Sequence, residues 1–352
     1  MNRLVTKNQL GELINIRREA KQAIADLPCM LNRFGLCESK PVQSHTLSAS
    51  VLRTICQSGE LYRLKNDPSE MDDDQRYSPA KIGVRAATAF KGFCATHDRD
   101  LFVSIDKKEF DPTPENMQLL FFRAMAQEIT KKAANKLIFD SYFTTGSNFV
   151  SDGNVERIAL RTTIGLRDSF FDFDSLWSMM EDREESIQFF AFDLDCLPFF
   201  AGIGVVNPEA FPVYFRHRDS YDGRVFRNIL FSVLPTAFGV RVAFAWFRGC
   251  NHLVKPLLDR FRWAKNNLFE FSLQLCLEHC ECTYFNPDVW SQIDEKTEKI
   301  IVELMSLNVD GLPYDIQKRQ LHEAGLDFSY RFRRRFTNSV WATRRYNRER
   351  LK

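Results

Sequence analysis

CMLNRFGLCESKPVQSH (residues 29–45) and CATHDRDLF (residues 94–102) hold the residues on which the fold of the N-terminal part depends. The first piece has two cysteines and a histidine. The second opens with a cysteine and a histidine that are separated by two residues. Thiolate sulfur and imidazole nitrogen are the ligands that Zn²⁺ prefers, and a structural zinc site needs four of them. We therefore predict a structural Zn²⁺ at Cys29, Cys37, Cys94 and His97.

His45 stands between the two pairs, and the residues around it leave three interpretations open. As a general base it would take a proton from water, because an imidazole titrates near neutral pH. As a metal ligand it would replace Cys29 or Cys37, since five candidates compete for four positions. As a structural residue it would precede a short helix over 47–55 that a neighbouring hydroxyl caps.

The order of these residues resembles that of the HNH, or ββα-metal, nucleases and of treble-clef zinc modules. Such modules take one ligand pair from a turn and a second pair from the start of a helix, and the nucleases have a histidine between the pairs. The resemblance covers residues 29–102 and implies that His45 is the general base. It also implies that Asp98 or Asp100 binds a catalytic divalent ion such as Mg²⁺, which stabilises the charge that develops on the phosphate.

Three longer segments, SHTLSASVLRTI, GFCATHDRDLF and LFFRAMAQE, resemble a group of bacterial proteins without an established activity. The first function that we expect is a metal-dependent nuclease, or a nuclease-related protein of bacterial anti-phage defence. The second is a non-catalytic, zinc-stabilised module that binds nucleic acid or a protein. Cleavage that depends on both Mg²⁺ and His45 would distinguish them, because only the first function requires both.

The chain has 352 residues, more than one domain usually contains, and its 32 phenylalanines indicate a core of bulky aromatic side chains. We predict an N-terminal unit over 1–150, a Phe-rich α+β domain over 151–330 and a basic tail over 331–352. Nine cysteines without a signal peptide indicate a reducing cytoplasm and no disulfides. Since no apolar run approaches the roughly 20 residues that span a bilayer, we expect no membrane partner.

The spacing of apolar residues predicts helices in both halves of the chain. Apolar positions recur every three or four residues over 4–27, 50–55, 114–139, 155–183, 253–282 and 292–307. Pro28 ends the first helix, and Pro114 stands at the start of the third. Turn-forming residues over 144–153 predict a linker, and the polar residues 65–79 predict an exposed loop.

Short runs rich in Phe, Val and Ile, separated by Pro or Gly, predict strands over 187–194, 199–206, 225–234 and 240–247. We expect these strands to form a mostly antiparallel sheet covered by helices. The fold class that follows is α+β, in which a small zinc-stabilised, treble-clef-like module and a long helix precede the sheet.

Two further groups of potential ligands have structural interpretations that we favour. Asp193 and Asp195 share one side of a strand and could hold Mg²⁺, but the solvated face of an edge strand also explains them. A second metal site is conceivable where cysteines and histidines gather, at Cys250, His252, Cys276, His279, Cys280 and Cys282. The spacing of Cys276 and Cys280 by one helical turn favours a buried helix face instead.

The C-terminal stretch RFRRRFTNSVWATRRYNRERLK (331–352) holds eight arginines, so the rest of the chain is net negative although the formal net charge is +2. Arginine binds phosphates with two parallel hydrogen bonds, and aromatic rings stack on unpaired bases. We predict an interface for RNA or single-stranded DNA at Arg331, Arg333, Arg334, Arg335, Trp341, Arg344 and Arg345. The alternatives are a solubilising tail and a contact with an acidic partner, which includes the acidic body of the chain itself.

Overall fold

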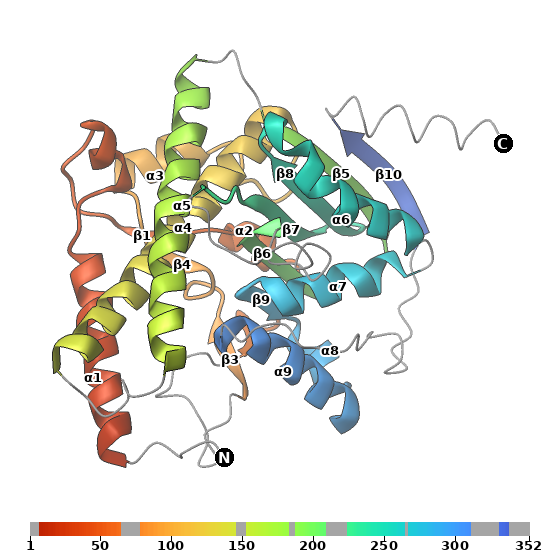
Figure 1. The fold of residues 1–352 in the computed structure, drawn as a ribbon. Helices are drawn as coiled ribbons and strands as arrows, with labels where there is room; N and C mark the ends of the chain where they lie inside the picture. The colour runs from red at the N-terminus through yellow and green to blue at the C-terminus, as the bar shows by residue number, and fades with distance from the viewer. Residues whose placement is uncertain are drawn as a thin grey trace.

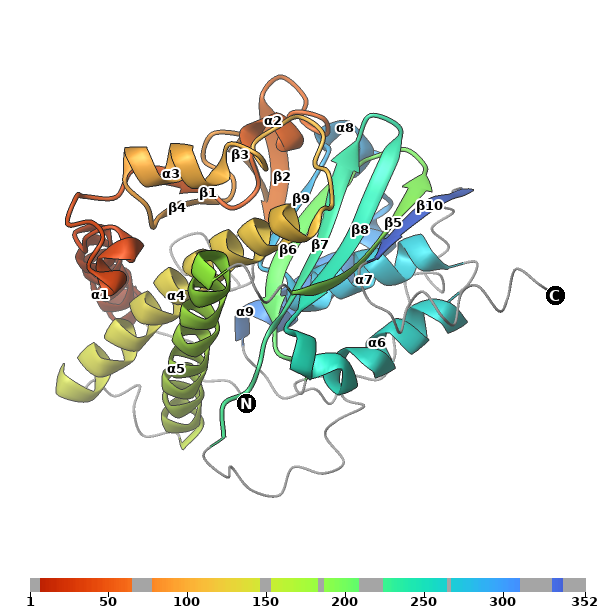
Figure 2. The same cartoon turned by 90° about the horizontal axis from the view of Figure 1, so that it is seen from above.

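The computed structural model describes residues 7–64, 78–145, 153–182, 187–208, 224–264, 267–310 and 331–337. Within them, an eight-stranded sheet lies between two layers of helices, and a two-stranded sheet stands apart from it (Figure 1, Figure 2). Every strand pairing is antiparallel. The expected α+β class is confirmed. Of the predicted linker over 144–153 and the predicted loop over 65–79, residues 146–152 and 65–77 lie outside the described residues.

The described helices are α1 (Lys7–Ala25), η1 (Met30–Phe34), α2 (Ala49–Leu52), α3 (Ala95–Phe102), α4 (Pro114–Thr145), α5 (Gly153–Asp182), η5 (Arg248–Cys250), α6 (Asn251–Trp263), α7 (Leu268–His279), α8 (Pro287–Trp290) and α9 (Glu295–Asp310). None of them is both long enough and apolar enough to cross a membrane.

The small sheet pairs β1 (Gln43–His45) with β4 (Ala89–Lys91). The large sheet contains β2 (Glu60–Leu64), β3 (Pro79–Gly83), β5 (Gln188–Asp195), β6 (Phe200–Val206), β7 (Ile229–Thr236), β8 (Gly239–Trp246), β9 (Cys282–Phe285) and β10 (Arg331–Thr337). Its order is β10-β5-β8-β7-β6-β9-β2-β3. The large sheet therefore includes β2 and β3, which precede the boundary that we predicted near residue 150.

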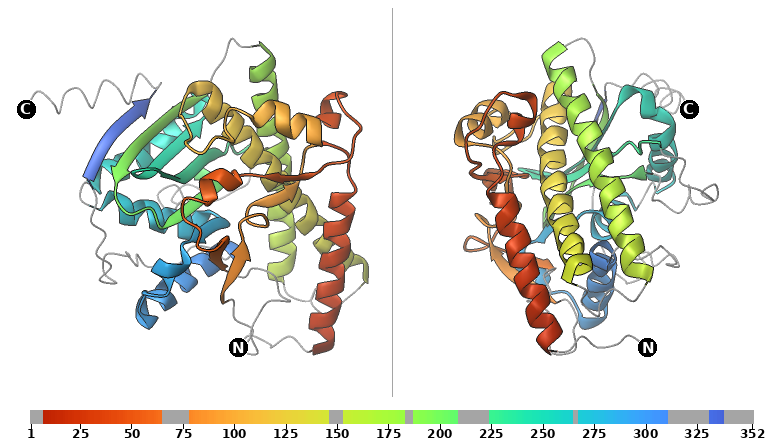
Figure 3. Two further views of the ribbon diagram at one scale, coloured as in Figure 1. Left: turned by 180° about the vertical axis from the view of Figure 1, so that it is seen from behind. Right: turned by 60° about the vertical axis from the view of Figure 1, so that its left-hand side comes forward.

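Helix α4 is the element to which both parts of the molecule attach. It starts at Pro114, whose missing N–H costs nothing in a first turn, and the hydroxyl of Thr113 accepts a hydrogen bond from the N–H of Asn116 at 3.2 Å. One side of α4 faces the sheet, and α1 packs against another part of α4 (Figure 3). Phe122 of α4 stacks on Phe173 of α5 at 4.3 Å, so these two helices form a single layer.

The opposite face of the sheet carries α6 and α7. On β6, Ile203 and Gly204 both line a space beside α4, and a Cβ on Gly204 would lie 2.8 Å from Sγ of Cys280, the residue that follows α7. Strand β6 contacts α4 and α7 and therefore lies between them. The glycine allows α7 to approach the backbone of β6 closely.

The strands expected from composition are present with shifted ends. The strand predicted over 225–234 begins only at Ile229, because the N–H groups of Phe226 and Asn228 bind carboxylates of α5 instead of a neighbouring strand. Strand β7 also continues through Pro235. Proline has no N–H, but β6 does not pair with β7 at this position, so no hydrogen bond between the two strands is lost. The helix predicted over 253–282 is two helices, α6 and α7, followed by β9.

The interpretation of Asp193 as part of the solvated face of an edge strand is wrong. Strand β10 pairs with β5 on the side opposite β8, so β5 is an interior strand. Asp193 is only 4% exposed, and its carboxylate contacts Arg241 at 2.7 Å and Arg334 at 3.2 Å. These two guanidinium groups occupy the carboxylate that a Mg²⁺ ion would need. The first residues of the predicted basic tail are thus part of the sheet.

Candidate metal centre

The first pair of candidate ligands flanks a tight turn. Cys29 precedes η1, and Gly35 ends that helix with φ +72°, where its N–H donates to the carbonyl of Asn32. A residue with a side chain is strained at this φ, which is why a glycine stands there. The chain reverses direction at this point, and Cys37 returns beside Cys29.

The second pair stands at the start of α3. Cys94 is the N-cap residue of this helix and His97 lies in its first turn, so both side chains leave from the same end. Backbone hydrogen bonds from Met30 to Gly92 and from Val42 to Phe93 hold the first turn against the segment that enters α3. The two pairs are brought together by backbone contacts that do not involve the ligands.

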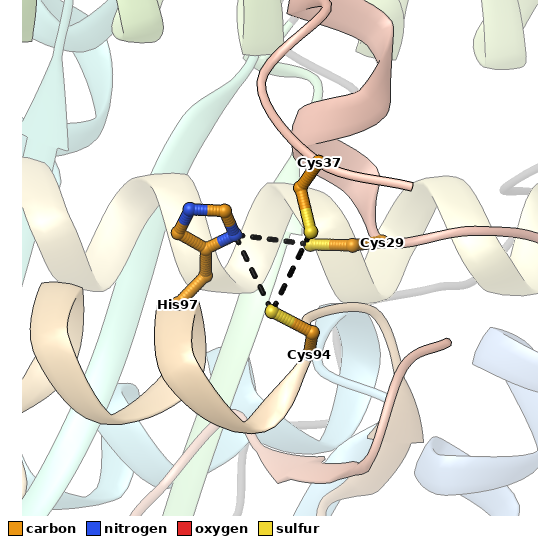
Figure 4. A group of neighbouring side chains, drawn as sticks. All are labelled: Cys29, Cys37, Cys94 and His97. Atoms are coloured by element: carbon orange, nitrogen blue, oxygen red, sulfur yellow. Dashed lines mark hydrogen bonds between the residues drawn. The ribbon is translucent and has the colours of Figure 1, made fainter. Parts of the chain in front are cut away.

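The four side chains converge on one point (Figure 4). Their ligand atoms all lie within 4.8 Å of one another. Sγ of Cys37 is 3.7 Å from Sγ of Cys94, and Nδ1 of His97 is 3.4 Å from Sγ of Cys94 and 3.6 Å from Sγ of Cys29. Tetrahedral bonds of about 2.0 to 2.3 Å require ligand-to-ligand edges of about 3.3 to 3.8 Å. The spacing therefore suits a tetrahedral metal ion.

The surroundings of the thiols differ across the group. Burial raises the pKa of the Cys29 thiol to about 11, whereas the N–H of Ser39 lowers the pKa of Cys37. A metal ion binds thiolates and displaces their protons, so it would compensate for the burial of Cys29. Three sulfurs and one imidazole nitrogen form a donor set that fits such an ion.

His45 does not belong to this group of four. It ends β1 and lies opposite Ala89 of β4, where it is half-buried. Its Nδ1 is buried and has no hydrogen-bond partner, and the hydroxyl of the preceding Ser44 is in the same state. Burial is the largest cause that lowers the pKa of His45, and the charge of Arg123 adds to it, so both favour the neutral imidazole.

Three charged side chains act on His45 from neighbouring elements. Arg123 of α4 is 2% exposed and contacts Asp106 at 2.6 Å and Asp98 at 3.3 Å. The guanidinium also lies 4.5 Å from the ring centre of Phe102. The two carboxylates raise the pKa of His45 and thus oppose Arg123. Of our predicted site residues, the structure places Asp98 in this cluster, whereas Asp100 is exposed on α3 and pairs with Arg99.

Sequence reasoning missed Arg123 and Asp106. A signal for Arg123 was present, because it interrupts the apolar run of LFFRAMAQE, and a lone arginine on a buried helix face needs carboxylate partners. Asp106 follows α3 without any such pattern. Its carbonyl accepts a hydrogen bond from the hydroxyl of Ser50 at 2.8 Å, which fixes the segment beside α2.

Strained backbone adjoins His45. Thr88, which precedes β4, has φ +58°, a conformation that is costly for a β-branched residue. Its N–H donates to Tyr284 Oη at 2.9 Å, and its carbonyl accepts from the amide of Gln127 at 3.2 Å. Its hydroxyl donates to the carbonyl of Leu47 at 3.0 Å. These contacts hold the strained residue in place.

The other predicted ligands and binding residues are distributed differently. Cys276 and Cys280 are buried, as the preferred interpretation of their spacing predicted. Cys282 on β9 is buried as well, whereas His252 is exposed on α6. Among the described residues they form no group with metal-binding spacing. Arg331, Arg333, Arg334 and Arg335 lie on β10, whereas Trp341, Arg344 and Arg345 lie outside the described residues.

No family model, no curated protein and no solved structure matches this chain.

Proposed function

We propose that the chain is a nuclease-related protein of HNH type, in which a structural Zn²⁺ at Cys29, Cys37, Cys94 and His97 supports His45 as a general base. Zinc is proposed because three thiolates and one imidazole in a closed tetrahedral arrangement are typical of its structural sites. The observation that carries the function is the position of His45. It ends the strand β1 that pairs with β4, and β4 leads directly into the helix α3 with the second ligand pair.

The protonation of His45 supports this role. A general base must be unprotonated before it acts, and the lowered pKa favours the neutral imidazole. The strained backbone at Thr88 also favours a functional site, since strain of this kind concentrates where geometry serves catalysis or binding. A treble-clef-like arrangement would explain why the zinc site and the proposed base occur in one small unit.

Mg²⁺ or another divalent ion would supply the charge that stabilises a phosphate in the transition state. Asp98 is the candidate ligand for it, because Asp98 acts on His45 and is partly accessible. Its Oδ1 contacts Arg123, so that ion would share Asp98 with a guanidinium group. Asp100 points to another partner and is a weaker candidate.

The test is the replacement His45→Asn in the full chain, with cleavage of single-stranded and duplex nucleic acid measured with and without Mg²⁺. Loss of a general base typically lowers a rate by about 10²- to 10⁴-fold. We expect that loss together with unchanged zinc content, because His45 is outside the group of four ligands. His252→Asn, at an exposed histidine on α6, is the matched control and should cleave like the wild type.

Two results would contradict the proposal. If His45→Asn releases the zinc, His45 is a ligand and the nuclease has no base. If the wild type does not cleave with Mg²⁺, the second candidate function is favoured, a non-catalytic zinc-stabilised module that binds nucleic acid or a protein. The observation on the side of that second candidate is Arg123, which already neutralises Asp98 and Asp106.

A further inference from the structure

The edge of the large sheet that β10 forms is densely cationic. Four of the seven residues of β10 are arginines, and all four are exposed. Among the described strands, β10 pairs with β5 alone and therefore stands at the edge of the sheet. Two carboxylates stand near these arginines in the register of the strands: Asp195 opposite Arg331, and Asp193 opposite Arg334.

The four arginines make different contacts. Arg334 forms an ion pair with the buried Asp193, which also pairs with Arg241. This ion pair helps to hold β10 against the sheet. Arg333 is displaced from the ladder by a bulge between Phe332 and Arg334. A bulge redirects a side chain, and here Arg333 lies 4.4 Å from the ring centre of Phe238, in the turn between β7 and β8.

Two exposed aromatic rings accompany the arginines. Phe238 is 59% exposed, and Phe332 is 44% exposed with Arg335 at 4.6 Å from its ring centre. Rings of this size are normally buried, so two of them at one end of a cationic strand need a reason. Each of these two rings therefore lies in contact with an arginine, so a guanidinium group and an aromatic surface stand side by side.

We propose that β10, together with the turn that carries Phe238, binds single-stranded nucleic acid. Guanidinium groups bind phosphates through paired hydrogen bonds, and exposed rings stack on unpaired bases. A duplex offers the phosphates but not the base faces. A second copy of this chain is disfavoured, because edge-to-edge pairing of two β10 strands would place arginine beside arginine. Binding here goes beyond the proposed nuclease, since it needs no cleavage at His45.

The charge part of the proposal is tested by binding of fluorescein-labelled oligothymidylate to the full chain, without Mg²⁺, at several salt concentrations. The double variant Arg331→Gln and Arg333→Gln removes two phosphate contacts, so the slope of log affinity against log salt should fall by about 1.4. The matched control is Arg18→Gln with Arg53→Gln, two exposed arginines far along the chain from β10. It should keep the wild-type slope, and an equal fall in both variants would overturn the proposal.

The aromatic part is tested by Phe238→Ala, because Phe332 also packs on Phe192 and its loss would disturb β10. Loss of one stacked base should weaken oligothymidylate binding roughly 5- to 150-fold and leave duplex binding nearly unchanged. Phe171→Ala is the matched control, since Phe171 is also exposed and also lies beside an arginine, Arg227 at 4.9 Å. It should bind like the wild type.

Normal binding of the oligonucleotide by Phe238→Ala would contradict single-stranded nucleic acid as the ligand of this surface. Displacement of the oligonucleotide by oligoglutamate of the same charge would also contradict it, because the surface would then suit an acidic peptide. The test is separate from that of the nuclease. His45→Asn should lose cleavage and keep its affinity for oligothymidylate. A wild-type protein that binds oligothymidylate but does not cleave with Mg²⁺ would contradict only the proposed function.

Discussion

Two groups of residues in this chain have the same composition, three cysteines and one histidine, yet they are arranged for different purposes. In the candidate metal centre, four ligand atoms lie within 4.8 Å of one another, two from residues that flank the turn at Gly35 and two from the start of α3. The second group is Cys276, His279, Cys280 and Cys282, at the end of α7 and the start of β9. There, Cys276 and Cys280 face the glycines of β6, whereas Cys282 Sγ lies 3.2 Å from Oε1 of Gln127 on α4.

The difference lies in the backbone. A turn and the first turn of a helix can meet at one point, and their side chains can then surround an ion. Residues four apart on one helix share a face but keep their side chains parallel, and the next strand points to the other side of the sheet. The number of sulfur and nitrogen ligands therefore does not define a site unless separate segments direct them inward.

The largest effect that would sharpen this comparison is expected for Cys94→Ser. Binding of a structural metal is coupled to folding, so the loss of one ligand should remove the metal and cost several kcal/mol in the free energy of unfolding. Cys276→Ala should keep one zinc per chain and lose less stability. Elemental analysis and denaturant unfolding measure both. A wild type without zinc, together with normal stability of Cys94→Ser, would contradict the metal centre, and stoichiometric zinc in Cys94→Ser would show that Cys94 is not a ligand.

A smaller effect is expected for Gly202→Ala on β6. The nearest atom to the added methyl group would be Sγ of Cys276, so we expect overpacking to cost about 1 to 3 kcal/mol. The double variant Gly202→Ala with Cys276→Ala should recover part of this loss, because the remaining neighbour, Cβ of Cys276, is 3.2 Å away. Zinc content should stay constant in both. No recovery in the double variant would show that the sulfur does not fill this space.

The smallest effect concerns His279. Burial lowers the pKa of this histidine to about 3, so the unfolded chain takes up a proton near pH 6.5, well before the folded chain does. Acid therefore favours the unfolded state between these two values. From pH 5.5 to 4.5 the free energy of unfolding should fall by about 1 kcal/mol more in the wild type than in His279→Gln. Parallel pH dependence in the two proteins would mean that His279 is accessible.

The part of the fold that sequence predicted best consists of long helices and of local ligand spacing. Helix α4 stands where the apolar period placed it, and residues 117–129 in its middle are nearly all buried. Helix α5 also stands where a helix was predicted, although its apolar period is weak and the buried residues described in it lie in its second half. Cys94 and His97 are three positions apart in one turn, so their proximity is local. The first ligand pair was harder, since it depends on the turn that ends at Gly35.

The features that were missed depend on partners far away in the chain. Strand β2 pairs with β9 through Tyr62 and Phe285, and its own short, half-polar sequence shows no clear alternation. Strand β10 is so rich in arginine that it looks like a tail, and it is a strand because β5 presents an open edge and Asp193 needs a second cation. Asp106 joins the cluster near His45 only through Arg123.

The position of β10 has a consequence for the synthesis of the chain. Among the described strands, those at the two edges of the large sheet are β3 (Pro79–Gly83) and β10 (Arg331–Thr337). While the ribosome is still making residue 337, β5 has no partner beyond β8, and its apolar edge can pair with another nascent chain. The arginines of β10 thus complete the sheet late and close it with a charged strand, which would protect the finished protein from aggregation on that side.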